Sequence, residues 1–223
     1  MNIMQTVLSS IGQKVVLATS GLIMFLLFLI PHMGGNILFL FGPDLFNSYA
    51  AHLHKLVPIV VGIEVLMLVS IIVHMNTGIR VAVANHLAAG KRKSLKSTPE
   101  RSLAAKLMPW TGAMIFIFIA KHLFDFTLGV EKAQVELNGH MVDDVYGMVY
   151  AYFQNPGNVL LYLLFMVAVG FHLSHALQSA LQTYGLYIPR EGSKIKLLST
   201  FVAIAMASTF AIIPVSALIY FYY

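Results

Sequence analysis

Five long runs of apolar residues dominate this chain and leave few folds open to it. A helix of about 20 apolar residues crosses the roughly 30 Å hydrocarbon core of a bilayer. Composition agrees, because 58% of the 223 residues are hydrophobic and only 10% are charged. The sequence therefore predicts an all-α integral membrane protein with five transmembrane helices and a single membrane domain, residues 1–223. The predicted spans are 15–41, 56–84, 106–128, 157–184 and 197–220.

Basic residues are distributed unevenly over the segments between these runs. Eleven lysines and arginines lie on one side, whereas only Lys55 and Lys132 lie on the other. Cytoplasmic loops are enriched in such residues, so we expect an inner (cytoplasmic) membrane protein with its N-terminus in the cytoplasm and its C-terminus outside. The net charge of +5 is attributed to this topology and to lipid, with no nucleic-acid partner expected. The eleven residues are Lys14, Arg80, Lys91, Arg92, Lys93, Lys96, Arg101, Lys106, Arg190, Lys194 and Lys196.

Four histidines, His32, His74, His122 and His172, lie one apiece in the first four apolar runs. Ionisable side chains at membrane depth are costly and usually face the interior of a bundle. The chain has no cysteine, so any iron that it holds needs histidine or methionine ligands. Four imidazoles on four helices are typical of haem ligation inside a helical bundle. We therefore expect the first four helices to form a haem-binding bundle.

The depth of each histidine predicts how the four combine. At about 1.5 Å per residue, His32 and His122 lie roughly 13 Å and 10 Å below the outer end of the bundle, whereas His74 lies roughly 9 Å from the inner face. His172 is in the inner half of its run. Depth thus pairs His32 with His122 and His74 with His172, each pair binding the iron of one haem b. Depth alone also allows His175 as the partner of His74. Iron with two histidine ligands has no open position for oxygen chemistry, so electron transfer is expected.

Four stretches around these histidines resemble the haem-binding helices of the cytochrome b558 membrane anchors of succinate dehydrogenases and fumarate reductases. The most specific elements are His-x-x-Gly-Asn at His32, His-x-x-x-Gly-Ile-Arg at His74 and His-Leu-x-Asp-Phe at His122. In addition, His172 precedes Tyr184 by twelve residues, where relatives have a Trp-Gly pair. The resemblance spans nearly the whole chain, although the fifth run aligns poorly and has no ligand, as in the family.

The resemblance implies a five-helix anchor that holds two haems b and exchanges electrons with menaquinone or a related quinone. Its cytoplasmic face would bind a flavoprotein subunit and an iron–sulfur subunit. In such a succinate:quinone oxidoreductase the dicarboxylate chemistry is on other subunits, and this chain is the electron-transfer and quinone-reactive part. The family register favours His172 over His175 as the ligand.

Glu64, in the second run, is the candidate for proton transfer at the quinone. It lies roughly 12 Å below the outer end, at the level predicted for the outer haem. A carboxylate there can accept a proton when a quinol is oxidised. Asp125, Lys121 and Tyr49 are other candidates at this level. A purely structural alternative is that Glu64 pairs with Lys121 or another polar residue.

Two other classes of membrane protein are kept as alternatives. A b-type cytochrome anchor of another respiratory complex, of the hydrogenase or formate dehydrogenase type, shares the haem chemistry but not the order of the motifs. A haem-free transporter more often has internal repeats and interrupted helices, and the sequence shows no repeat. The remaining histidines of the loops are interpreted as solvated surface residues. They are His52, His54, His86 and His140.

Overall fold

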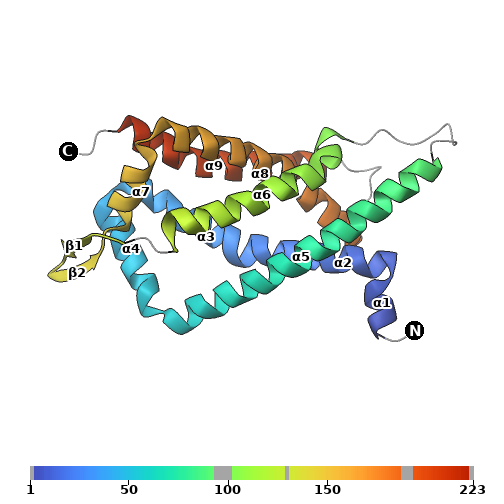
Figure 1. Cartoon of the computed structure of the whole chain (residues 1–223), viewed down its shortest axis with the longest axis horizontal. Helices are drawn as coiled ribbons and strands as arrows, with labels where there is room; N and C mark the ends of the chain where they lie inside the picture. Colours follow the sequence, from blue (N-terminus) through green and yellow to red (C-terminus); the bar gives the residue numbers. More distant parts are fainter. Residues whose placement is uncertain (1–2, 93–101, 129–130, 187–192, 221–223) are drawn as a thin grey trace.

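The computed structural model describes residues 3–92, 102–128, 131–186 and 193–220, and these are almost entirely helical (Figure 1). Five helical segments are long and apolar enough to cross a membrane, which confirms the predicted five-helix membrane protein. The first begins at Ser10, earlier than expected, because the helix continues into the preceding polar residues. The five are Ser10–Phe41, Val57–Ala88, Leu103–Phe126, Pro156–Thr183 and Lys194–Ile219.

The elements follow one another in the order α1 (Ile3–Leu8), α2 (Ser10–Met24), the π-helix η1 (Phe25–Leu29), α3 (Ile30–Ile37), the 3-10 helix η2 (Leu38–Phe41), α4 (Pro43–Lys55), α5 (Val57–Arg92), α6 (Leu103–Phe126), β1 (Gln134–Leu137), β2 (His140–Asp143), α7 (Val145–Phe153), α8 (Pro156–Thr183) and α9 (Ser193–Ile219). The basic residues Lys93, Lys96, Arg101 and Arg190 lie outside the described residues.

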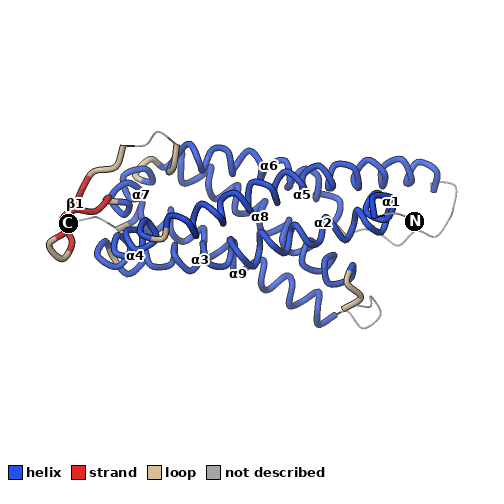
Figure 2. The backbone as a smooth tube through the Cα atoms, turned by 90° about the horizontal axis from the view of Figure 1, so that it is seen from below, coloured by secondary structure: helices blue, strands red, loops and turns tan. Residues whose placement is uncertain are grey.

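The helices form an elongated bundle with the two termini at opposite ends (Figure 1). One end, called here the hairpin end, holds α4, the antiparallel strands β1 and β2, and α7 (Figures 1 and 2). The opposite end, called the N-terminal end, holds α1. A buried side chain joins two elements of the hairpin end, because Asn47 of α4 donates to the Asp144 carboxylate (2.9 Å) and accepts from the Tyr146 amide (2.8 Å). Neither α4 nor α7 was expected from the sequence, since both lie between the apolar runs.

The spans pack unequally along the bundle. Helix α2 contacts α5 and α8, α6 packs on α8, and α9 covers α8 and α3. In the most apolar window of each span, 33% of the residues are buried in α8 and in α9, against 11%, 11% and 6% in the first three spans. The protein's own side chains therefore form a dense core around α8 and α9. The faces of the first three spans bury much less against other helices.

The first span changes helix type just before His32. The Ile30 amide donates to the Phe25 carbonyl, five residues back, in the one-turn π-helix η1. Pro31 has no amide hydrogen, and its ring conflicts with the carbonyl four residues earlier in an α-helix. A π-turn relieves such a conflict by adding one residue to the turn, and π-turns are frequent at functional sites. The consequence is a changed helical register between the two halves of this span.

Candidate functional site

The structure brings the four span histidines together in two pairs. The ring centres of His32 (α3) and His122 (α6) are 5.8 Å apart, and those of His74 (α5) and His172 (α8) are 6.3 Å apart. The first pair lies toward the hairpin end and the second toward the N-terminal end. Depth in the sequence predicts these pairs, while a ligand role for each residue stays a prediction. Within the described residues, His175 makes no ring contact with His74.

The pair toward the N-terminal end is held through its Nδ1 atoms. Nδ1 of His74 lies 3.2 Å from the Leu17 carbonyl oxygen and 3.2 Å from the Ser20 hydroxyl, both on α2. Nδ1 of His172 lies 3.2 Å from the Thr111 hydroxyl of α6. Histidines that bind a metal through Nε2 almost always use Nδ1 in this way, to orient the ring and raise its basicity.

A glycine stands beside each of these two rings. A Cβ atom at position 21 would lie 3.1 Å from Cε1 of His74, and one at position 112 would lie 3.4 Å from Cε1 of His172. Each glycine directly follows the hydroxyl residue that contacts the same histidine. Small residues let helix backbones approach closely in membrane bundles, and here they make room for imidazoles. Sequence reasoning missed both Ser20-Gly21 and Thr111-Gly112, although a hydroxyl–glycine pair on each of two spans is a signal that could have been noticed.

The pair toward the hairpin end lies among aromatic rings. Phe28 stacks on His32 with ring centres 4.9 Å apart, and Phe118 lies 5.5 Å from the ring of His122. Nδ1 of His122 is buried and has no hydrogen-bond partner in the described part of the chain. A buried imidazole nitrogen without a partner is costly. This pair is therefore held mainly by ring packing, in contrast to the pair toward the N-terminal end.

The first and third spans each have a hydroxyl residue and a histidine on one face of the helix, and in the first span this alignment depends on the π-helix. Thr111 precedes His122 by 11 residues, so both lie on one face of α6, about 20° apart at 100° per residue. Ser20 precedes His32 by 12 residues, which in a regular α-helix gives about 120°. The extra residue of η1 removes this offset and returns His32 to the face of Ser20. On both spans the hydroxyl residue and the histidine thus share one face of the helix.

The spacing within each pair suits a metal ion between the two rings. An imidazole nitrogen binds a metal at about 2.0–2.1 Å and the ring centre lies about 1.2 Å further, so rings on opposite sides of one ion have centres about 6.4 Å apart. The observed separations, 5.8 Å and 6.3 Å, lie close to this value. Side chains alone would need three or four ligands, and no group of three or more His, Cys, Asp or Glu residues able to hold an ion occurs in the described residues. The spacing of each pair therefore leaves room for one metal ion between its two rings.

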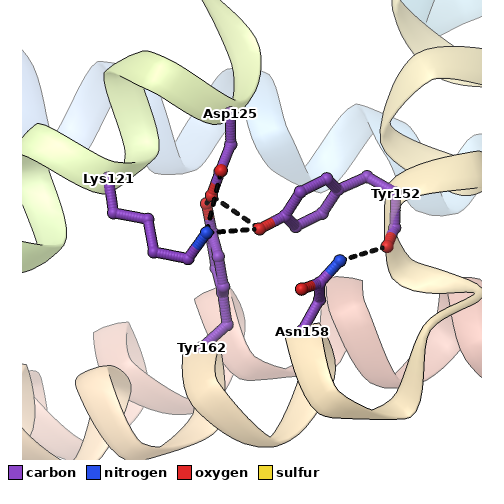
Figure 3. A network of polar contacts seen from close by, with 5 residues as sticks. All are labelled: Lys121, Asp125, Tyr152, Asn158 and Tyr162. Carbon is purple, nitrogen blue, oxygen red and sulfur yellow. Dashed lines mark hydrogen bonds and ion pairs between the residues drawn. The ribbon is translucent and has the colours of Figure 1, made fainter.

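A polar cluster lies near the hairpin end, between α6, α7 and α8 (Figure 3). The Asp125 carboxylate accepts hydrogen bonds from Lys121 (2.9 Å), Tyr152 (2.6 Å) and Tyr162 (2.6 Å). Lys121 also donates to the Tyr152 hydroxyl at 3.0 Å, and Asn158 donates to the Tyr152 carbonyl at 3.0 Å. Burial and the hydrogen bond to Asp125 raise the pKa of the Tyr152 hydroxyl, which therefore keeps its proton at neutral pH. Asp125 thus has three donors, one of which is the paired cation Lys121, and it joins α6, α7 and α8.

Glu64 is placed differently from these residues. It lies on α5 with an exposed side chain, and it has no hydrogen-bond or ion-pair partner in the described residues. The alternative that it pairs with Lys121 is wrong, because Lys121 binds Asp125 and Tyr152. Tyr49 packs against the backbone of Gly35, where a Cβ atom would lie 2.6 Å from its ring. Among the predicted proton-transfer candidates, Glu64 alone has a carboxylate that makes no hydrogen bond or ion pair with another described residue.

The other histidines are exposed at the bundle ends. His52, His54, His86 and His140 are all solvent-exposed in the structure, as interpreted from the sequence. Nδ1 of His54 lies 3.9 Å from the Asp143 carboxylate of β2. None of the four contacts either histidine pair among the described residues.

Comparisons with protein-family models, curated proteins and solved structures found no match to this chain.

Proposed function

We propose that this chain is the dihaem cytochrome b membrane anchor of a succinate:quinone oxidoreductase, either a succinate dehydrogenase or a quinol:fumarate reductase. It passes electrons between a membrane quinone and an iron–sulfur subunit. The observation that supports this most strongly is the presence of two facing histidine pairs, at two levels, on four different spans. The same motifs that resemble the cytochrome b558 family supply these four histidines.

In this proposal each imidazole has a defined task. His32 and His122 bind the outer haem iron, and His74 and His172 bind the inner one. Bound haem supplies reversible one-electron oxidation and reduction of iron. Phe28 stacks on the ring of His32, and the Nδ1 partners of the inner pair fix its ring orientation. Two ligands per iron leave no position for oxygen, so the chain transfers electrons without oxygen chemistry.

Two levels joined by one bundle give a path for electrons across the membrane. The 11 residues from Thr111, which contacts the inner pair, to His122 span about 16 Å of helix. The first span repeats this separation between Ser20 and His32. A haem held by His32 and His122 would lie near the hairpin end, and one held by His74 and His172 would lie near the N-terminal end, so that electrons could pass between the two. Of the basic residues predicted to face the cytoplasm, those that the structure describes lie toward the latter end, where a flavoprotein and an iron–sulfur subunit would bind.

Glu64 is proposed to accept a proton from the quinol, menaquinol or a relative. It precedes His74 on α5 by ten residues, as Tyr162 precedes His172 on α8. The Tyr162 ring lies 6.2 Å from that of His122, so Tyr162 is at the level of the outer pair. Ten residues correspond to about 15 Å of helix, and counting back ten residues from His74 therefore places Glu64 at the same level. An exposed carboxylate on a lipid-embedded helix is costly unless a ligand or water meets it. A quinone arriving from the bilayer would find this carboxylate beside the outer haem.

The proposal is tested on the full-length chain purified in detergent from a haem-competent bacterial host. We expect two haems b per chain by pyridine haemochrome and iron analysis, with a sharp low-spin α band on reduction. His32→Ala and His122→Ala should each lose the same haem, and His74→Ala and His172→Ala the other. His175→Ala, one turn away from His172, is the matched control and should keep both.

Each alternative predicts a different result. A chain without haem would leave a transporter or a structural anchor. Loss of a haem in His175→Ala but not in His172→Ala would show that His175, and not His172, is the ligand of the inner haem. A dihaem chain that co-purifies with hydrogenase or formate dehydrogenase subunits, and not with a flavoprotein, would belong to another respiratory complex.

A further inference from the structure

We propose that Thr111 and Ser20 are positioning residues that set the redox potential of the inner haem, by holding a proton on Nδ1 of His172 and of His74. This inference rests on the proposed function, because it concerns how the chain tunes the ligands of a haem. It goes beyond that function in assigning a task to two hydroxyls on helices that provide no inner ligand.

The contacts of His74 define its tautomer. A backbone carbonyl oxygen can only accept a hydrogen bond. Nδ1 of His74 therefore donates its hydrogen toward the Leu17 carbonyl, 3.2 Å away, and the Ser20 hydroxyl at 3.2 Å shares this hydrogen. The Ser20 hydroxyl in turn donates to the Val16 carbonyl at 2.9 Å. With the proton on Nδ1, Nε2 of His74 keeps a lone pair for iron.

Thr111 acts in the same way on His172. Its hydroxyl lies 3.1 Å from the Leu107 carbonyl and 3.2 Å from that of Met108, and both can only accept. The single hydroxyl hydrogen is directed to these carbonyls, so the oxygen accepts from Nδ1 of His172 at 3.2 Å. Ser20 and Thr111 are each 5% exposed, and little room remains for water to replace either hydroxyl.

A hydrogen bond from Nδ1 increases the basicity of Nε2. A more basic ligand stabilises ferric iron relative to ferrous iron, which lowers the reduction potential. Removing the acceptor reverses this effect, so the potential of the inner haem rises. The outer haem provides an internal reference, because Nδ1 of His122 has no partner in the described residues and neither hydroxyl contacts the outer pair.

The two sites differ in what a substitution leaves behind. Thr111→Val keeps the side-chain shape and removes the one acceptor that His172 has within the described part of the chain. Ser20→Ala removes a hydroxyl but leaves the Leu17 carbonyl for His74. The rise in potential should therefore be larger for Thr111→Val than for Ser20→Ala. Thr111→Ser restores a hydroxyl and should return the potential toward that of the unmodified chain.

The experiment is a spectroelectrochemical titration of the full-length chain, with electron paramagnetic resonance to follow ring orientation. Thr209→Val is the matched control, since Thr209 is a partly buried residue of α9 whose hydroxyl, within the described residues, donates to the Ala205 carbonyl of its own helix and contacts neither histidine pair. The expected result is a higher inner-haem potential in Thr111→Val, a smaller rise in Ser20→Ala, and no change in Thr111→Ser, in Thr209→Val or at the outer haem. Selective loss of the inner haem in Thr111→Val, with retention in Thr111→Ser, equally supports the hydroxyl.

The inference fails if both haems bind and Thr111→Val titrates like Thr209→Val. It also fails if Thr111→Ser shifts the potential or loses the haem as Thr111→Val does, because packing and not the hydroxyl would then be responsible. A chain that binds no haem at all overturns the proposed function itself, and this inference with it.

Discussion

At the scale of single residues, the inner histidine pair depends on a neighbour without a side chain. Gly21 approaches the edge of His74 so closely that a methyl group would lie 3.1 Å from Cε1. The ring cannot turn away without losing its contacts with Leu17 and Ser20. The close approach of His74, and not only helix packing, therefore favours a small residue at this position.

Gly21→Ala should displace His74 and weaken or remove the inner haem. We expect overpacking to cost about 1–3 kcal/mol, measured as loss of inner-haem occupancy and a lower midpoint of thermal unfolding. The control is Gly62→Ala on α5, where a Cβ atom would meet nothing within 4 Å. That change should be neutral or should stabilise by about 0.4–1 kcal/mol. Equal effects at both positions would argue against close packing at Gly21.

Glu64→Gln should slow quinol oxidation without removing either haem. General base catalysis contributes roughly 10²–10⁴-fold, so we expect at least about 10²-fold loss of quinol-dependent haem reduction. Reduction by dithionite should remain intact. Glu136→Gln, an exposed carboxylate on β1, is the matched control and should leave the rate unchanged. Full activity of Glu64→Gln would show that quinol oxidation does not need the Glu64 carboxylate.

At the scale of elements, the π-helix η1 brings Ser20 and His32 to one face of the first span. Ser20 and His32 share a face only because one extra residue is absorbed between them. Helix α6 reaches the same alignment of Thr111 and His122 with one residue fewer and no π-turn. The two spans thus arrive at the same geometry from different lengths.

This equivalence predicts an unusual tolerance to deletion. Removing Leu27 from η1 should convert the turn to a regular α-helix, preserve the Ser20–His32 alignment, and leave both haems bound. Removing Ile117 from α6 should rotate His122 by about 100° relative to Thr111 and abolish the outer haem. Haem content and the optical spectrum of the two deletion variants provide the measurement. Loss of haem after the Leu27 deletion, with retention after the Ile117 deletion, would contradict the role of η1.

At the scale of the whole molecule, the ends of the bundle differ in charge and in structure. The hairpin end holds α4, the β1–β2 hairpin and α7, with Asn47 and the Asp125 cluster joining its elements. Lys194, at the start of α9, lies at the opposite end with several other basic residues. The predicted topology places the hairpin end outside and the N-terminal end in the cytoplasm.

The absence of cysteine makes this topology simple to measure. Single Glu136→Cys and Lys194→Cys variants place one thiol at each end, at exposed positions. Glu136→Cys should react with a membrane-impermeant maleimide in intact spheroplasts, whereas Lys194→Cys should react only after lysis. The reverse pattern would mean that the predicted orientation is inverted.

The sequence alone determined the features that depend on composition along the chain. Span length follows from consecutive apolar residues, so the five helices were predicted with errors only at their ends. The levels of His32, His74, His122 and His172 follow from a constant rise per residue, and the pairs that depth predicted are those that lie together.

Only the tertiary structure decided which faces meet. The contacts of Ser20 and Thr111 with histidines on other helices, and the occupation of Lys121 by Asp125, depend on helix rotation and proximity. Rotation accumulates at about 100° per residue. One inserted residue, as in η1, therefore changes which face a side chain lies on, although it hardly changes the depth of that side chain. An error of one residue moves the predicted axial position by only about 1.5 Å, so predictions of depth remain correct. The same error changes which side chains are predicted to be in contact.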